Sequence, residues 1–189
     1  VAGQDWLTCV GRLAFPIFAF LLVEGFFHTR DLRRYVLRLL LLALLSEIPF
    51  DLMYAGTSFF PFHQNVIWTF LIALFCMWVI ERVKRRGNLW LTLLAAAGMS
   101  LAGWLAGTIA MVDYYGAGVL TVLVFYLFRG GLWWQRLGQA AGMIWINCGL
   151  LAGLVLQVNI LGLTVEFPQQ GFALLALIPI WLYRGRQGY

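Results

Sequence analysis

Long apolar runs with almost no charge inside them constrain this sequence more than any other feature. A membrane-spanning helix needs about 20 predominantly apolar residues. Seven runs approach or reach that length, at about 6–28, 35–53, 65–81, 89–111, 114–129, 137–157 and 171–184. Hydrophobic residues make up 62% of the 189 residues and charged residues only 11%, against about half and about a quarter in soluble domains. The chain is therefore predicted to be an integral membrane protein.

The runs are continuously apolar and do not alternate with the period of two that a barrel strand requires. We therefore predict an all-α fold, a polytopic transmembrane bundle of about seven helices, with residues 1–189 as a single membrane domain. Cys9, Cys76 and Cys148 lie singly in apolar runs, so they predict neither a disulfide framework nor a metal site.

The basic residues predict the topology, because Lys and Arg are retained on the cytoplasmic side during insertion. They follow the first, third, fifth and seventh runs, as Arg30, Arg33, Arg34, Arg38, Arg82, Lys84, Arg85, Arg86, Arg129, Arg136, Arg184 and Arg186. The alternate connections 54–64, 112–113 and 158–170 contain no Lys or Arg. We expect the start of the chain outside and its end in the cytoplasm. The net charge of +5 is then explained by orientation, and nucleic acid is not an expected partner.

Three pairs of glycines have the GxxxG spacing that lets helix backbones approach closely. They are Gly103 with Gly107, Gly138 with Gly142, and Gly149 with Gly153. Packing within the chain is the favoured interpretation, and the face of a homo-oligomer is the alternative.

Three ionisable residues, Arg12, Glu24 and Glu47, lie inside apolar runs. Each costs at least about 2.5–3.5 kcal/mol in the membrane, so each should face the bundle interior and pair. The first two runs must be antiparallel, which places Arg12 and Glu47 at a similar depth, about 9 Å from the outer ends. We predict that these two meet, and that Glu24 pairs with Arg38 near the cytoplasmic end.

Asp51 follows Glu47 by four residues and lies on the same helix face. Other polar residues belong to the same outer end by topology: Asp5, His63, Gln64, Asn65, Asp113, Asn159 and Glu166. This grouping favours a polar, largely acidic cavity that opens outward. A buried ion pair that only fixes helix register is the alternative.

A basic rim is expected on the cytoplasmic side, formed by Arg33, Arg34, Lys84, Arg85 and Arg86. Its ordinary explanation is topology and attraction to anionic lipid headgroups. Binding of a phosphorylated cofactor is the alternative. The sequence contains no glycine-rich phosphate loop, zinc motif or nucleophile elbow.

Several strings of the sequence resemble one known family. They are Gly11-Arg12-Leu13-Ala14-Phe15-Pro16-Ile17-Phe18-Ala19-Phe20, Ser46-Glu47-Ile48-Pro49-Phe50-Asp51 and Asp113-Tyr114-Tyr115-Gly116. Together they are similar to the TraX family, closely over about 5–130 and loosely beyond. Members usually have a further membrane helix with an Asp-His pair at the start and another at the end. We therefore expect this chain to lack one helix at each end relative to the family.

The resemblance implies a multi-pass protein of the bacterial inner membrane, similar to the conjugative-transfer factor that acetylates the amino terminus of pilin. It also implies distant kinship with membrane acyltransferases that take acetyl-CoA from the cytosol and modify an acceptor on the other face. The implied donor is acetyl-CoA, and the implied acceptor is pilin or an envelope polysaccharide.

Acetyl transfer needs a base for the acceptor, a donor for the developing oxyanion and a basic site for the phosphates of CoA. His63 or Asp51 would act as the base. Arg12, with Glu47 as its counter-charge, or else Asn65 would act as the oxyanion donor. The basic rim would hold the phosphates of CoA.

One alternative is a transporter of protons or a small solute, whose path would be lined by Arg12, Glu24, Glu47 and Asp51. Another is a non-enzymatic assembly factor for pili or the envelope.

Overall fold

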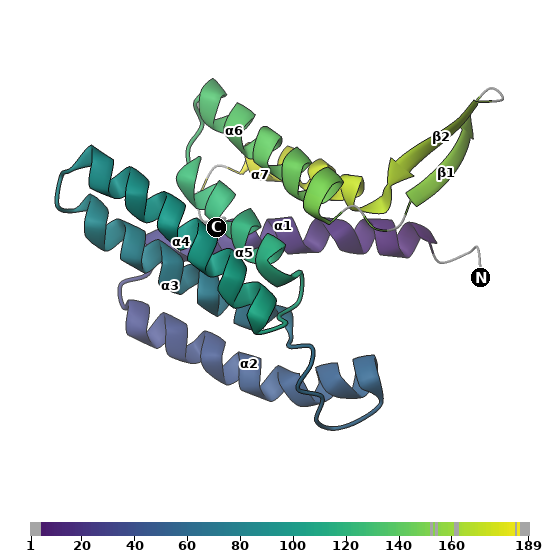
Figure 1. Cartoon of the computed structure of the whole chain (residues 1–189), viewed down its shortest axis with the longest axis horizontal. Coiled ribbons are helices and arrows are strands. Elements are labelled where there is room, and N and C mark those ends of the chain that lie inside the picture. Colours follow the sequence, from purple (N-terminus) through teal and green to yellow (C-terminus); the bar gives the residue numbers. More distant parts are fainter. Residues whose placement is uncertain (1–4, 152, 154, 161–162, 184, 186–189) are drawn as a thin grey trace.

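Seven α-helices form a bundle in the described part of a computed structural model of the chain (Figure 1). The structure describes residues 5–151, 153, 155–160, 163–183 and 185. The α-helices are α1 Asp5–His28, α2 Leu32–Ala55, α3 Val66–Lys84, α4 Leu89–Ile109, α5 Tyr115–Leu127, α6 Trp133–Ile144 and α7 Leu177–Leu182. This confirms the predicted fold class of a helical membrane bundle.

The central element is α5, a helix of 13 residues of which nine are buried. It packs against α1, α3, α4 and α6, so its side chains supply much of the core together with Phe15, Leu74 and Met77. A helix this short and this enclosed is held by protein on most sides. Its length does not need to match the full thickness of the bilayer.

Three of the seven predicted spans are long and apolar enough to cross a membrane by themselves: Gly11–His28, Val66–Lys84 and Leu89–Ile109. The apolar helices Tyr115–Leu127 and Gln169–Leu182 are shorter. α2 is long but carries five charged residues between Arg33 and Asp51. Only Ala43 and Asp51 of α2 are buried, which leaves its leucines exposed to the surroundings of the bundle.

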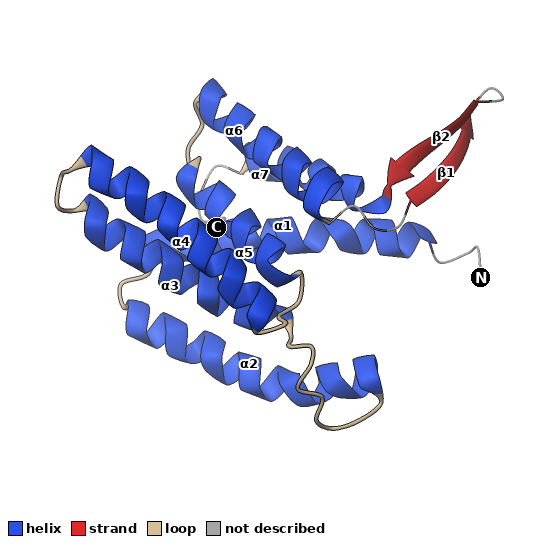
Figure 2. Ribbon diagram, in the orientation of Figure 1, coloured by secondary structure: helices blue, strands red, loops and turns tan. Residues whose placement is uncertain are grey.

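The prediction of a helix over 137–157 was wrong at its second half. α6 ends at Ile144, a π-helical turn, η1, covers Trp145–Leu150, and the strand β1 begins at Val155. β1 (Val155–Ile160) pairs antiparallel with β2 (Leu163–Pro168), with Val155 opposite Pro168 and Ile160 opposite Leu163. Figure 2 shows this hairpin projecting from the helices. Glycine weakens a helix and β-branched residues favour strands, and Gly149, Gly153 and the valines of β1 fall in this stretch.

The last apolar run also differs from a continuous helix. A 3₁₀ helix, η2 (Gln169–Ala176), precedes the short α7. Pro179 lies in the first turn of α7, where a missing backbone N–H removes no helical hydrogen bond.

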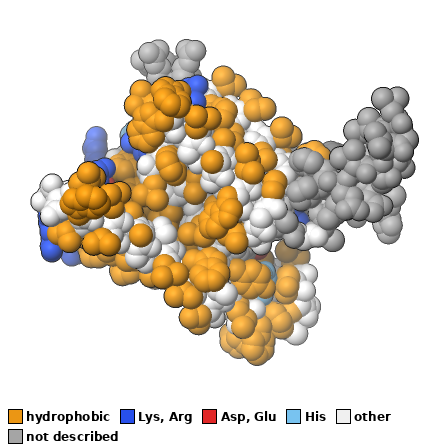
Figure 3. Space-filling model, turned by 45° about the horizontal axis from the view of Figure 1, so that its top comes forward, with side chains coloured by type: hydrophobic (Ala, Val, Ile, Leu, Met, Phe, Trp, Pro, Cys, Tyr) orange, Lys and Arg blue, Asp and Glu red, His pale blue; other side chains and the backbone are white. Residues whose placement is uncertain are grey.

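Basic side chains gather at one end of the bundle (Figure 3). The α1–α2 and α3–α4 connections lie together at this end (Figure 1), as the charge pattern predicts. The connections 56–65 and 110–114 lie at the opposite end of the same helices. The side chains of Asp5, Cys9, Asn159 and Glu166, and residues Arg184 and Arg186, fall outside the described residues. Which end faces the cytoplasm stays a prediction.

Glycines make the contact between α4 and α5, and between α5 and α6, unusually close. A Cβ atom on Gly107 would lie 2.9 Å from the Tyr115 carbonyl oxygen, and one on Gly142 2.7 Å from Val124. The glycine pairs 103 and 107 and 138 and 142 therefore serve packing within the chain. Gly149 and Gly153 have no such close neighbour from another helix.

We predict that Gly107→Ala lowers the free energy of unfolding by about 1–3 kcal/mol, because the added methyl meets backbone atoms of α5 that cannot move aside. Gly98→Ala is the matched control on the same helix, since its Cβ would meet nothing within 4 Å. That control should be neutral or stabilise by up to about 1 kcal/mol. Thermal unfolding in detergent measures both. Equal melting temperatures for the two variants would contradict the packing described.

Candidate functional site

Arg12 on α1 faces Asp113 and Tyr114, in the connection between α4 and α5. Burial raises the pKa of both residues, and the positive charge of Arg12 acts in the opposite direction. Among the described residues Arg12 makes no ion pair with Glu47. The predicted pairing of Arg12 with Glu47 is therefore wrong, because α2 packs chiefly on α3 and is not held against α1.

The connection before α5 is held in a strained conformation. Met111, Tyr114 and Tyr115 all have positive φ angles, of 51°, 60° and 48°, which side chains other than glycine rarely adopt. Two hydrogen bonds tie this connection to the 56–65 connection, from Gln64 N to Met111 O at 3.0 Å and from Asp113 N to Gln64 O at 2.9 Å. The Tyr114 ring stacks on Phe15 of α1 at 4.2 Å. Strain of this kind is concentrated at functional sites.

His63 lies in the 56–65 connection and faces Asp113. Its Nε2 atom lies 3.8 Å from the Asp113 Oδ1 atom, an ion-pair distance that is too long for a hydrogen bond. The imidazole ring stacks on Tyr54 at 4.5 Å. Burial raises the pKa of Asp113 above its ordinary value, while His63, the Tyr114 backbone N–H and Arg12 act in the opposite direction.

Glu47 and Asp51 reach the same end of the bundle from α2. Asp51 accepts a hydrogen bond from the Phe60 backbone N–H at 2.8 Å and is almost fully buried. Glu47 accepts hydrogen bonds from the Asn65 side-chain amide and from Trp68 Nε1, the latter at 2.9 Å. These contacts fold the 56–65 connection back onto α2.

Asn65 has a structural role that its type alone did not reveal. It caps α3 by accepting a hydrogen bond from the Ile67 N–H, and its amide donates to Ala43 O and to Glu47. Both amide protons are therefore engaged. Asn65 positions Glu47, and Arg12 is the group at this end whose donors face the Asp113 and Tyr114 side chains.

Buried polar atoms without a hydrogen-bond partner concentrate here. Of the five such side-chain atoms in the described residues, four are Arg12 Nε, Glu47 Oε1, Asp51 Oδ1 and His63 Nδ1. An unmade hydrogen bond at a buried polar atom costs about 1–3 kcal/mol, so several at one end indicate a functional site. We call Arg12, Glu47, Asp51, His63, Asp113 and Tyr114 the polar cluster. The sequence analysis selected Arg12, Glu47, Asp51 and His63 as site residues and placed Asp113 at the same outer end, whereas Tyr114 was named only in the third family-like string.

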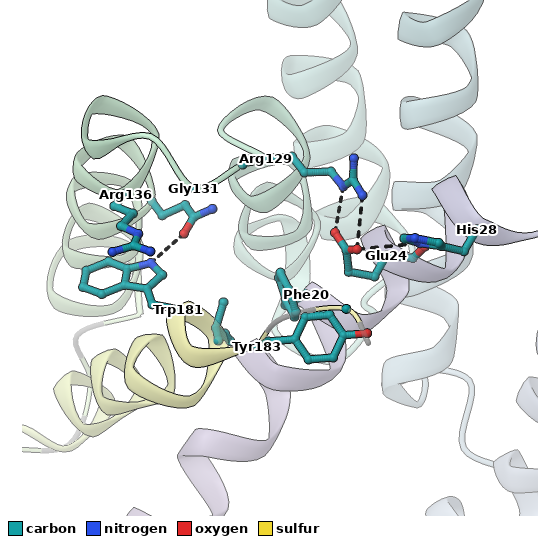
Figure 4. A pocket seen from close by; sticks show the side chains of 12 residues that line it. Phe20, Glu24, His28, Arg129, Gly131, Arg136, Trp181 and Tyr183 are labelled. Atoms are coloured by element: carbon teal, nitrogen blue, oxygen red, sulfur yellow. Dashed lines mark hydrogen bonds and ion pairs between the residues drawn. The ribbon is translucent and has the colours of Figure 1, made fainter. Parts of the chain in front are cut away.

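Glu24, at the basic end of α1, is paired with Arg129 and not with Arg38. Arg129 Nε and a terminal guanidinium nitrogen lie 2.7 and 3.1 Å from the two carboxylate oxygens, as Figure 4 shows. Arg38 instead donates to the Arg34 carbonyl oxygen at 3.3 Å. The predicted pair fails because Glu24 faces the end of α5, where Arg129 follows the helix.

A cavity of about 410 Å³ adjoins this pair. Figure 4 shows Arg136 over the Trp181 ring and Tyr183 near Phe20. The guanidinium of Arg136 lies 5.9 Å from the centre of the Trp181 ring, and Trp181 Nε1 donates to Gln139 Oε1 at 2.8 Å. The wall thus combines basic groups with aromatic faces, and the sequence analysis had used Arg129 and Arg136 only to predict the topology.

The five residues of the predicted basic rim do not converge on one pocket. Arg34 pairs with Asp31 at 3.1 Å, and Lys84 lies 3.9 Å from Glu81. Arg33 and Arg85 line two different hollows near α2 and α3. Arg86 lies beside them without lining either hollow. The rim is therefore a basic surface that surrounds several openings.

Comparison with known proteins agrees with the family-like strings. The family model described as TraX protein matches residues 1–182. The chain is also similar to the probable fimbrial assembly protein FimC, serogroup H1, of Dichelobacter nodosus, with 37% identity over 82 residues. That match covers 40% of this chain and 34% of the relative, so the chain spans about a third of the relative's length. No solved structure matches the chain significantly.

We predict that Glu24→Gln destabilises the protein by about 2–4 kcal/mol, because it leaves the Arg129 charge without its counter-ion. The loss should fall below that of a fully buried pair, since the Arg129 side chain is 36% exposed. Asp31→Asn is the control, because it removes the exposed Asp31–Arg34 pair while keeping a side chain that caps α2. Its cost should be at most about 1 kcal/mol. A melting temperature for Glu24→Gln as high as that of Asp31→Asn would refute the pairing.

Proposed function

This chain belongs to the TraX family, and from that premise we propose that it forms the membrane core of an acetyltransferase. The donor is acetyl-CoA from the cytosol, and the acceptor is an amine or hydroxyl group on the other face of the bacterial inner membrane. The amino terminus of pilin or an envelope polysaccharide has the required chemistry. The name of the FimC relative, a probable fimbrial assembly protein, supports a pilus-related role.

One observation carries this proposal: His63, whose side chain is only 12% exposed, has an unpartnered ring nitrogen and faces the carboxylate of the strained connection before α5. His63 Nε2 faces Asp113, and His63 Nδ1 has no partner among the described residues. Catalytic hydrogen bonds are often long before the substrate binds; once the 3.8 Å contact shortens, Asp113 would orient one ring nitrogen and leave the other to accept a proton. This is the arrangement that an acceptor amine or hydroxyl needs in order to become a nucleophile.

The reaction follows from these positions. The acceptor nitrogen or oxygen attacks the thioester carbonyl carbon while its proton passes to His63 Nδ1. Arg12 lies close enough to Asp113 and Tyr114 to donate to the oxyanion of the tetrahedral intermediate. The carbon–sulfur bond then breaks, CoA leaves as a thiolate, and the proton held by His63 neutralises the thiolate.

The donor is expected to enter from the basic end. The rim arginines and Lys84 attract its phosphates over a distance, and Arg136, in the cavity of Figure 4 where Arg129 is already paired with Glu24, would hold them. Glu24 at this cavity and Arg12 in the polar cluster are 12 residues apart on α1, about 18 Å along the helix. The long pantetheine arm of CoA must cover this distance, so α1 forms the shared wall of both sites.

We predict that His63→Gln reduces acetyl transfer about 10²–10⁴-fold in kcat, the range expected for loss of a general base. The assay uses the full-length protein that contains this chain, reconstituted in liposomes with labelled acetyl-CoA on one side and an acceptor peptide on the other. Thr92→Val, at the start of α4 and outside the polar cluster and the cavity, is the matched control and should keep full activity. Thermal unfolding confirms that both variants fold.

Two results would overturn the acetyltransferase proposal. Transfer at the wild-type rate by His63→Gln would remove His63 as the base. No transfer by the wild-type protein, with flux of a small solute or only support of pilus assembly, would favour the transporter or the non-enzymatic assembly factor.

A further inference from the structure

A groove runs between α2 and α3 at the basic end, away from the polar cluster and from the cavity of Figure 4. Two adjoining hollows of about 540 and 900 Å³ share Arg30, Leu32, Trp78 and Arg82 in their walls. We call them together the α2–α3 groove. α2 packs chiefly on α3, and Figure 1 shows it at the edge of the bundle, away from the other helices.

The mouth of the groove carries uncompensated positive charge. Arg30, Arg33, Arg82 and Arg85 line it, and none has a carboxylate within ion-pair distance among the described residues. The two carboxylates of the lining are already neutralised. Asp31 pairs with Arg34 at 3.1 Å, and Glu81 accepts from Tyr126 at 3.0 Å and faces Lys84.

The floor of the groove is apolar and open. Leu37 and Phe75 line it and are 56% and 58% exposed, and Leu71 lies deepest along α3. From Arg82 to Leu71 the groove follows 11 residues of α3, about 16 Å of helix. The groove therefore has a basic mouth and a long hydrophobic slot. In a membrane, we expect the mouth to lie among the headgroups and the slot among the acyl chains.

Trp78 marks the boundary between these two zones. Arg82 lies over its indole ring at 5.0 Å, and tryptophan and arginine both prefer the membrane interface. The polar edge of the site is thus fixed at headgroup depth.

We propose that the α2–α3 groove binds one anionic glycerophospholipid, with its phosphate among Arg30, Arg33, Arg82 and Arg85 and one acyl chain along Leu37, Leu71 and Phe75. Charge complementarity selects an anionic headgroup, and the apolar floor selects a lipid over a soluble phosphate. The bound lipid fills the space between α2 and α3 and so steadies α2, which carries Glu47 and Asp51 at its far end. The evidence for this groove does not depend on acetyl transfer, and lipid binding is measured without acetyl-CoA.

The test measures lipid binding by the full-length protein in neutral detergent, by native mass spectrometry and by the rise in melting temperature on lipid addition. Phosphatidylglycerol should bind and stabilise, and phosphatidylcholine should not. Each guanidinium near an anionic phosphate contributes about fivefold in affinity. The Arg82→Gln variant should therefore bind phosphatidylglycerol about fivefold more weakly, and the double variant Arg30→Gln/Arg82→Gln about 25-fold more weakly. Arg86 belongs to the same rim but lies outside the groove, so Arg86→Gln should leave phosphatidylglycerol binding unchanged.

Further arms test the lipid identity and the slot. Glycerophosphoglycerol, which has the headgroup without acyl chains, should neither bind nor stabilise. Leu71→Trp fills the floor without altering charge, and should lower lipid occupancy while leaving the melting temperature in lipid-free detergent unchanged. Equal binding of phosphatidylcholine, equal binding of the free headgroup, or an equal loss in Arg86→Gln and Arg82→Gln would each overturn the proposal.

Discussion

Charge inside an apolar bundle must be matched by charge from another helix, and this constraint organises the structure around α1 and α5. α1 carries Arg12 and Glu24, about 18 Å apart. Arg129, just after α5, forms an ion pair with Glu24, and the charge of Arg12 acts on Asp113 and Tyr114, just before α5. The 13 residues of α5 span about 20 Å, so the two separations agree. α5 is buried at the centre because it packs against α1, α3, α4 and α6, and the Glu24–Arg129 pair holds its end to α1.

This arrangement also explains why the two ends of the bundle differ in chemistry. At the basic end, the Glu24–Arg129 pair is close and bidentate, and it leaves Arg136 and the surrounding basic residues free to meet anions. At the other end, Asp51 of the polar cluster is buried and its other members are partly buried, and Arg12, Glu47, Asp51 and His63 each have a buried polar atom without a partner. Buried groups of this kind are retained where their reactivity is used. The same helix, α1, therefore connects a region suited to phosphates with one suited to proton transfer.

The sequence was sufficient to predict the membrane class, the helical bundle and the end at which the basic residues gather. It also identified Arg12, Glu24 and Glu47 as residues that require partners. It did not identify the partners, because we assumed that consecutive helices α1 and α2 are the closest neighbours. The structure instead places α5 beside α1. This contact joins helices far apart in the sequence, and comparing the depths of residues in the membrane does not predict which helices are neighbours.

The hairpin of β1 and β2 and the short α7 were missed for a related reason. Hydropathy does not distinguish a buried strand from a buried helix in an apolar run, and only the valines and glycines after Ile144 indicated the change. The strained residues before α5 were equally invisible, since Met111, Tyr114 and Tyr115 are not types that normally predict positive φ.

The most direct test of this account is a double-mutant cycle between Arg12 and Asp113. Free energies of unfolding are measured for Arg12→Gln, Asp113→Asn and the double variant, with a parallel cycle between Arg12 and Glu47. If α1 is fixed to the start of α5 as described, Arg12 and Asp113 couple by about 1–2 kcal/mol, and Arg12 and Glu47 by less than about 0.5 kcal/mol. Coupling of Arg12 to Glu47 in place of Asp113 would contradict the arrangement of the bundle and the polar cluster built on it.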